Sequence, residues 1–168
     1  MKGLLALVGL VAIVAIVASY IWRSGEARQP IQFSHKAHID KKVKCKACHT
    51  HFLERASAGV PTLEDCMTCH EGAQSKDPMG IEEERRLSEY AERKQEIGWV
   101  KLVSLPDHAF FSHRQHVVLA KIECATCHGP VGESTMLPTY PLVKVSMDWC
   151  VGCHTKRKAE TDCLACHK

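Results

Sequence analysis

The chain has 168 residues, of which 22 are Lys or Arg and 19 are Asp or Glu, and its formal charge at pH 7 is +3. This length holds at most one compact domain plus an appendage, and so small a charge, without a long basic tract, argues against nucleic-acid binding. Beyond residue 22, only about one third of the residues are apolar once the ten cysteines are set aside, against ~45–50% in typical globular domains. A conventional enzyme with a large hydrophobic core is therefore disfavoured, and something other than side chains should fill the interior.

The first predicted element is a helix over residues 3–22, a run in which Ser19 is the one clearly polar residue. Twenty residues at ~1.5 Å each span about 30 Å, the thickness of the hydrocarbon core of a bilayer. Tyr20 and Trp22 stand at its end, where aromatic residues favour the membrane interface. The run exceeds the ~7–15 apolar residues usual in a signal peptide. We therefore expect an uncleaved transmembrane signal-anchor over residues 1–22, with a cleaved signal peptide as the alternative.

The remainder of the chain is marked by five copies of the motif Cys-x-x-Cys-His, which together contain all ten cysteines. This motif is the attachment signature of c-type haem. Its two thiols add across the haem vinyl groups, and the imidazole beside them is held under the iron as the proximal ligand. We therefore predict five covalently attached haem c groups. The predicted thioether cysteines are Cys45, Cys48, Cys66, Cys69, Cys124, Cys127, Cys150, Cys153, Cys163 and Cys166, and the predicted proximal ligands are His49, His70, His128, His154 and His167.

Three other interpretations of the cysteines fit less well. Zinc ribbons use two Cys-x-x-Cys pairs for each metal ion, so five pairs would leave one over and the histidines unexplained. A disulfide framework does not require a histidine after every second cysteine. A thioredoxin-type redox pair occurs once, in a βαβ context that this sequence lacks. The haem interpretation also accounts for the thin apolar composition, because porphyrins would form the core.

Six histidines lie outside the motifs, and five are needed if every iron takes a second axial ligand. Four of the six belong to a repeat, Phe-Ser-His-x-x-His, that precedes the first and third motifs. Histidines three residues apart share one face of a helix and can reach two neighbouring haems. The predicted distal ligands are His35, His38, His108, His113 and His116. His51 is the sixth and is expected to be a surface or hydrogen-bonded side chain, while Met147 is an alternative axial ligand.

Between the second and third motifs the sequence predicts a charged helix over about residues 78–98. Asp77 and Pro78 can begin it and Gly98 can end it. Its expected ion pairs are Glu82 with Arg86 and Glu89 with Arg93, and its expected apolar stripe is Leu87, Tyr90, Ala91 and Ile97. The helix either ties two haem clusters together or offers a docking face to a partner subunit. The predicted fold is mainly α with extensive irregular loops: a class III-like multihaem cytochrome c domain over residues 23–168, with haem clusters at about 30–75 and 105–168.

Several of these motifs resemble the membrane-anchored pentahaem cytochrome subunit of alternative complex III and are similar to the related multihaem subunit of the menaquinone reductase complex. The resemblance runs from about Pro30 to His167. It rests on Phe33-x-His35-x-x-His38, Gly59-Val60-Pro61 ahead of Cys66-Met67-x-Cys69-His70, Leu105-Pro106-Asp107-His108 before Phe111-x-His113-x-x-His116, Cys127-His128-Gly129-Pro130-Val131 and Met147-Asp148-Trp149-Cys150. It implies partners in a larger complex: an iron–sulfur/molybdopterin-like periplasmic subunit and polytopic quinone-binding membrane subunits.

The expected function is electron transfer without catalysis by the chain itself. Haem is attached outside the bacterial cytoplasm, so we expect a single-pass protein of the bacterial inner membrane whose haem domain faces the periplasm. It would relay electrons between a quinone-reactive membrane complex and a periplasmic electron carrier, and it would not bind nucleic acid. The alternatives are a catalytic multihaem reductase, which needs a vacant iron position, and a free-standing anchored quinol dehydrogenase.

Overall fold

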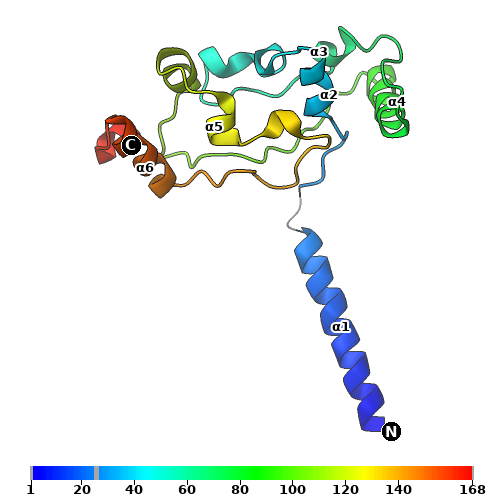
Figure 1. Ribbon diagram of the computed structural model, residues 1–168. Helices are drawn as coiled ribbons and strands as arrows, with labels where there is room; N and C mark the ends of the chain where they lie inside the picture. Colours follow the sequence, from blue (N-terminus) through cyan, green and yellow to red (C-terminus); the bar gives the residue numbers. More distant parts are fainter. Residues whose placement is uncertain (1, 25–26, 168) are drawn as a thin grey trace.

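A computed structural model describes residues 2–24 and 27–167, with the side chains of residues 8–19 and 27–167. Within these residues the chain is mainly helical and has no strand, and its only β-type pairing is an isolated bridge between Ala109 and His167. Figure 1 shows short helical pieces joined by long loops, with one long helix standing apart from them. The predicted mainly helical, loop-rich fold is confirmed. In chain order the elements are α1 (Lys2–Ser24), α2 (His35–Asp40), η1 (Cys45–Ala47), η2 (Thr50–Leu53), α3 (Leu63–Met67), α4 (Pro78–Glu92), η3 (Arg114–Leu119), α5 (Cys124–His128), η4 (Val131–Glu133), α6 (Met147–Arg157) and α7 (Cys163–Cys166).

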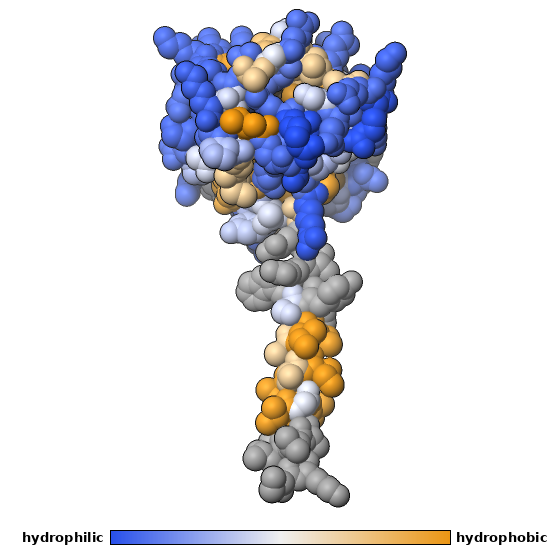
Figure 2. Space-filling view, turned by 90° about the vertical axis from the view of Figure 1, so that its right-hand side faces the viewer, coloured by the Kyte–Doolittle hydropathy of each residue, from blue (hydrophilic) through white to orange (hydrophobic). Residues whose placement is uncertain are grey.

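The long helix α1 has 23 residues, and its residues 8–19 form the coloured, largely apolar part of the stem in Figure 2. Its side chains from Val8 to Ser19 are exposed, and the Ser19 hydroxyl donates a hydrogen bond to the Ile16 carbonyl at 2.8 Å. The predicted membrane segment over residues 3–22 includes side chains at 3–7 and 20–22 that lie outside the described ones. Among the residues that the structure describes, no helix combines the length and apolar character needed to cross a membrane.

Most of the short α-helices begin at a side chain that caps the first turn. Thr62 accepts a hydrogen bond from the Asp65 N–H, and the Asp65 carboxylate accepts one from the Thr62 N–H, which is a complete capping box. Ser34 caps α2, Ser146 caps α6 and Asp162 caps α7. Because helices of four to six residues are marginal alone, such caps define where each one starts, and contacts elsewhere must hold it in place.

Helix α4 agrees with the predicted charged helix at its start and differs at its end. The Asp77 carboxylate accepts a hydrogen bond from the Gly80 N–H at 2.9 Å, and Pro78 occupies the first helical position. The helix stops at Glu92 instead of near Gly98, because Lys94 adopts a left-handed conformation with φ 51°. The N–H of Gln95 then donates to the Tyr90 carbonyl at 3.0 Å, closing the turn. Both expected ion pairs are present, Glu82–Arg86 at 3.2 Å and Glu89–Arg93 at 3.3 Å.

Only one small apolar cluster is buried in the described part of the chain. It consists of Ile31, Leu87 and Ile97, with Leu63, Cys66, Met67, Tyr90 and Trp99 partly buried around it. The Trp99 indole N–H donates to the Pro61 carbonyl at 2.9 Å, which ties the segment after α4 to the loop before α3. Three buried residues are far too few to stabilise a domain of this size. The polypeptide is therefore a shell whose interior must be completed by something else.

Candidate haem-binding sites

We number the five Cys-x-x-Cys-His motifs in chain order. Site 1 is Cys45, Cys48 and His49; site 2 is Cys66, Cys69 and His70; site 3 is Cys124, Cys127 and His128; site 4 is Cys150, Cys153 and His154; site 5 is Cys163, Cys166 and His167. Each motif lies on a single helical turn, in or directly beside η1, α3, α5, α6 and α7. In site 1 the His49 N–H donates to the Cys45 carbonyl at 3.0 Å, and sites 2 and 5 have the same bond at 3.1 Å and 2.8 Å. A helical turn brings both thiols and the imidazole to one side of the backbone.

All ten cysteines lie in the described residues, and none of them is in a disulfide. Partial burial raises the pKa of the Cys66 thiol to about 11, and the neighbouring Cys48 thiol adds to the shift. Nowhere in residues 2–24 and 27–167 do three His, Cys, Asp or Glu side chains converge as the ligands of a metal ion would. The two thiols of each motif are thus close in sequence but form no disulfide, which leaves both free for thioether links to one haem.

The histidines of the motifs face histidines of the predicted distal set. The pairs and the distances between their ring centroids are His38 and His70 at 6.1 Å, His113 and His128 at 6.3 Å, His116 and His154 at 6.0 Å, and His108 and His167 at 5.5 Å. With metal–nitrogen bonds of about 2 Å and a nitrogen about 1 Å from the ring centre, two imidazoles on opposite sides of one metal ion have centroids about 6 Å apart. Each pair therefore leaves the space that one iron between two imidazoles would occupy.

The hydrogen bonds of the imidazole rings leave Nε2 free to bind a metal. Nδ1 donates to a backbone carbonyl in His38 (Ser34, 2.9 Å), His49 (Gly59, 2.7 Å), His113 (Ala56, 2.6 Å), His116 (Ser112, 2.8 Å) and His154 (Glu160, 2.5 Å). A carbonyl oxygen can only accept, so Nδ1 carries the proton and Nε2 keeps its lone pair. Metal-bound histidines are held in this way by their second nitrogen. The residues present fit haem.

After these four pairs, His35 remains from the predicted distal ligands and His49 remains from the motif histidines. Burial lowers the pKa of His35 to about 4, and the nearby His49 and His38 add to the shift. His35 is thus neutral at pH 7, which is the form that binds a metal. Its Nδ1 is buried and has no hydrogen-bond partner.

The two Phe-Ser-His-x-x-His segments have the same local structure. Phe33 stacks on His38 with centroids 4.2 Å apart and meets His35 edge-on at 5.0 Å. Phe111 repeats this with His116 at 4.8 Å and His113 at 4.7 Å. The serine carbonyl of each segment accepts from Nδ1 of the second histidine. Phenylalanine and serine were part of the predicted repeat, but their role in orienting both imidazoles is visible only in the structure.

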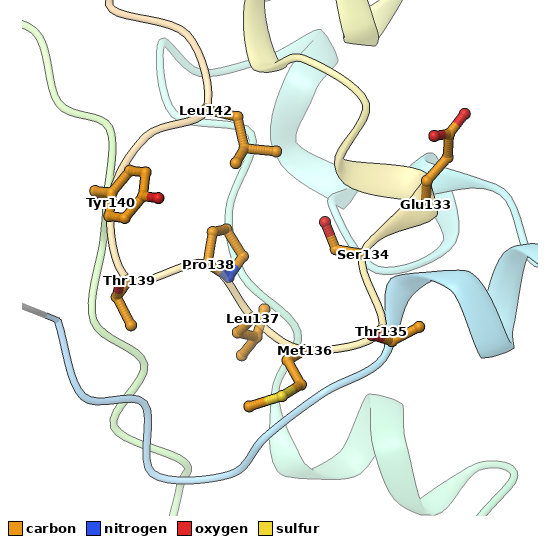
Figure 3. Close-up of a pocket in the computed structure, with 9 residues that line it drawn as sticks. All are labelled: Glu133, Ser134, Thr135, Met136, Leu137, Pro138, Thr139, Tyr140 and Leu142. Atoms are coloured by element: carbon orange, nitrogen blue, oxygen red, sulfur yellow. The ribbon is translucent and has the colours of Figure 1, made fainter.

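His51 and Met147 stand apart from these pairs. The His51 ring packs on Gly59, whose φ is 84°, and a Cβ there would lie 2.7 Å from Cδ2 of His51. Met147 begins α6 and its side chain is 64% exposed. A surface hollow of about 420 Å³ also lies outside the pairs: it is formed by the loop after η4, and no cysteine or histidine lines it (Figure 3).

Contacts between neighbouring motifs place sites 2, 1 and 3 next to one another. His38 on α2 faces His70 of site 2. His35 on the same helix is close enough to His49 of site 1 for His49 to add to the lowering of the His35 pKa, which burial mainly causes. Burial mainly raises the pKa values of Cys66 of site 2 and Cys48 of site 1; Cys48 adds to the shift of Cys66, and Cys69 of site 2 adds to the shift of Cys48. Cys45 of site 1 adds to the raised pKa of Cys124 of site 3, which partial burial mainly causes.

Sites 3, 4 and 5 continue the row. His113 and His116 lie at the start and inside of η3 and face sites 3 and 4. Cys153 and Cys150 of site 4 contribute to the raised pKa of Cys127, which partial burial mainly causes. Cys166 of site 5 contributes in the same way to the raised pKa of Cys150. The spatial order is therefore 2–1–3–4–5, which differs from the order in the sequence.

One acidic residue that sequence reasoning missed lies beside site 2. Oε1 of Glu84, on α4, is 3.2 Å from Nδ1 of His70, and both side chains are mostly buried. Burial would raise the pKa of Glu84, but hydrogen bonds from Ser75 and Gln74, with His70 nearby, lower it on balance. No sequence signal distinguishes Glu84 from the other carboxylates of this highly charged helix.

Together, the paired imidazoles, the unpaired thiols and the near absence of an apolar core define a multihaem c-type cytochrome. The chain belongs to the family of cytochrome c7 and related cytochromes c, which matches residues 31–94 and 109–168. Each matched segment contains one Phe-Ser-His-x-x-His element. The chain is also similar to the multihaem cytochrome c subunit of menaquinone reductase from Nitratidesulfovibrio vulgaris, with 32% identity in an alignment that covers 85% of this chain and 78% of the relative.

Proposed function

We propose that the chain binds five covalently attached haem c groups and relays electrons between a quinone-reactive membrane complex and a periplasmic redox partner. The observation that carries the proposal is the set of four facing imidazole pairs, with ring centroids 5.5 to 6.3 Å apart. Haem, when bound, supplies a one-electron couple at each site. In this proposal the axial pairs are His35 with His49, His38 with His70, His113 with His128, His116 with His154 and His108 with His167.

The residues suit a relay better than a catalyst. Two imidazoles at each proposed site would hold the iron from both sides and leave no position for a substrate, so we propose that the chain is not an enzyme by itself. The backbone carbonyls that hold Nδ1 of the rings fix the ligand geometry and limit rearrangement when the charge of a site changes. The row 2–1–3–4–5 gives every site a neighbour and leaves two ends, at sites 2 and 5, for partners.

We further propose that the chain is a subunit of a quinol oxidoreductase like alternative complex III. The relative from N. vulgaris is a subunit of a menaquinone reductase, which supports assembly into a larger quinone-reactive complex. The proposed partners are an iron–sulfur/molybdopterin-like periplasmic subunit and polytopic quinone-binding subunits. In this arrangement α1 anchors the protein in the bacterial inner membrane and the haem domain faces the periplasm, where haem is attached.

Purification through a C-terminal tag in mild detergent tests this assembly. The full-length chain is expected to bring down an iron–sulfur protein and polytopic membrane subunits, identified by mass spectrometry. Recovery of the cytochrome alone would contradict the subunit assignment. A matched variant that starts at residue 27 behind a cleavable signal peptide, produced in cells that lack the proposed membrane partners, should appear in the soluble periplasmic fraction, and its retention in the membrane there would contradict anchoring by α1.

A further inference from the structure

The partner of the His70 ring differs in charge from those of five other proposed ligands. Five rings direct Nδ1 at a neutral backbone carbonyl. Nδ1 of His70 instead lies 3.2 Å from Oε1 of Glu84, with the two side chains only 20% and 15% exposed. This nitrogen is buried and makes no hydrogen bond of good alignment, so the carboxylate is the acceptor within its reach once the ring is oriented by a metal.

Glu84 is held in place by neighbours that favour its ionised form. Its carboxylate accepts hydrogen bonds from the Gln74 N–H at 3.0 Å, the Ser75 N–H at 3.0 Å and the Ser75 hydroxyl at 3.1 Å. Hydrogen bonds from backbone N–H groups stabilise the charged form of a carboxylate. The loop before α4 thus presents a fixed negative charge to the imidazole of site 2.

A carboxylate that accepts a hydrogen bond from the Nδ1–H group makes the imidazole a more basic ligand. A more basic ligand stabilises ferric iron relative to ferrous iron, and hydrogen bonding of this kind is one means by which a protein sets a haem potential. We infer that Glu84 is a positioning residue that orients His70 and makes site 2 the low-potential end of the row. This inference rests on the proposed haem ligation by His70.

Because site 2 is terminal in the order 2–1–3–4–5, the inference also assigns a polarity to the relay. Electrons have the least affinity for the low-potential end, so they would enter at site 2, beside α4, and leave toward site 5, beside α7. The donor would then contact the part of the molecule formed by α3, α4 and the loop that carries Gln74.

The test is a redox titration of the purified holoprotein, followed by electron paramagnetic resonance so that the haems are resolved. His38→Ala, which removes the proposed second ligand of site 2, identifies the signal of that site. Glu84→Gln should raise the midpoint potential of that one haem, with a shift of about tenfold in its reduction equilibrium, or ~59 mV for one electron. The other four potentials should not move.

The matched control is Glu82→Gln, which removes the same charge from an exposed position on α4. An equal shift in this control, or no shift in Glu84→Gln, would overturn the role of Glu84. If Glu84→Gln fails to retain its haems, Glu84→Asp keeps the charge but withdraws it from Nδ1, and it should shift the same signal in the same direction. A wild-type protein without five low-spin haems would instead refute the proposed function, and the inference with it.

Discussion

The two halves of the haem domain share one ligand-bearing element but differ in how they are held together. The N-terminal half, residues 27–104, buries Ile31, Leu87 and Ile97 under α4. In the C-terminal half, residues 105–167, the one buried residue is Gly129. Both halves present a Phe-Ser-His-x-x-His element with nearly the same ring contacts. The ring contacts within each Phe-Ser-His-x-x-His element are therefore set locally, whereas stability must come from apolar packing in one half and from haem in the other.

Removal of haem should produce the largest difference between the two halves. A variant with all ten cysteines replaced by serine is expected to lose amide protection throughout the C-terminal half, because no apolar cluster remains there. Protection should persist only around α4, where Leu87 and Ile97 pack, and even there it should be weak. Hydrogen exchange read by mass spectrometry measures both halves at once, and equal protection in the two would contradict the account.

Removal of a single distal ligand should affect one site and leave the rest. His113→Ala takes away the imidazole whose centroid lies 6.3 Å from that of His128. One of five haems is expected to become high-spin, as seen in the optical and electron paramagnetic resonance spectra. His51→Ala is the matched control, because that ring packs on Gly59 instead of facing a motif histidine, and its spectrum should equal that of the wild type. An unchanged spectrum for His113→Ala would remove this residue from the ligand set.

Truncation of the apolar cluster should destabilise the N-terminal half alone. Leu87 is 8% exposed at the centre of that cluster, and loss of a buried leucine typically costs about 2–5 kcal/mol of unfolding free energy. Denaturant unfolding followed by hydrogen exchange should locate the loss around α4. Ile81→Ala, at a site 52% exposed on the same helix, should change stability by much less. Loss of protection in the C-terminal half of Leu87→Ala would show that the halves are not independent.

The smallest expected effect is that of a substitution at Gly129, in the C-terminal half, on the unfolding free energy. The φ of Gly129 is 71°, and a Cβ there would lie 3.1 Å from Cβ of Leu142 and 3.3 Å from Cγ2 of Val143. Gly129→Ala should therefore lower the unfolding free energy of the holoprotein by about 1–3 kcal/mol. Gly152→Ala, inside α6 with open space around it, should instead be neutral or stabilising by up to about 1 kcal/mol. The same sign for both variants in thermal unfolding would contradict this explanation.

The motifs and the repeat made much of this molecule predictable, because their information is local. Asp77 and Pro78 define the start of α4 as predicted, and Leu87 of the expected apolar stripe is buried on that helix. Ile97 of the same stripe is also buried, but it lies beyond the end of the helix. The predicted end of α4, near Gly98, was wrong, because nothing in the sequence indicates that Lys94 adopts a positive φ. The sequence also could not predict which imidazoles face each other, since this depends on contacts such as that of His113 with the Ala56 carbonyl, 57 residues away. The same holds for Glu84, which only the packing of α4 brings to His70.

The most direct test of the central claim is a haem count combined with electron paramagnetic resonance of the oxidised, purified protein. The five proposed imidazole pairs predict five haems for each polypeptide, all of them low-spin ferric, with no high-spin signal and no sign of methionine ligation. A high-spin signal that responds to added small ligands, or a count below five, would contradict the account of a closed row of bis-histidine sites.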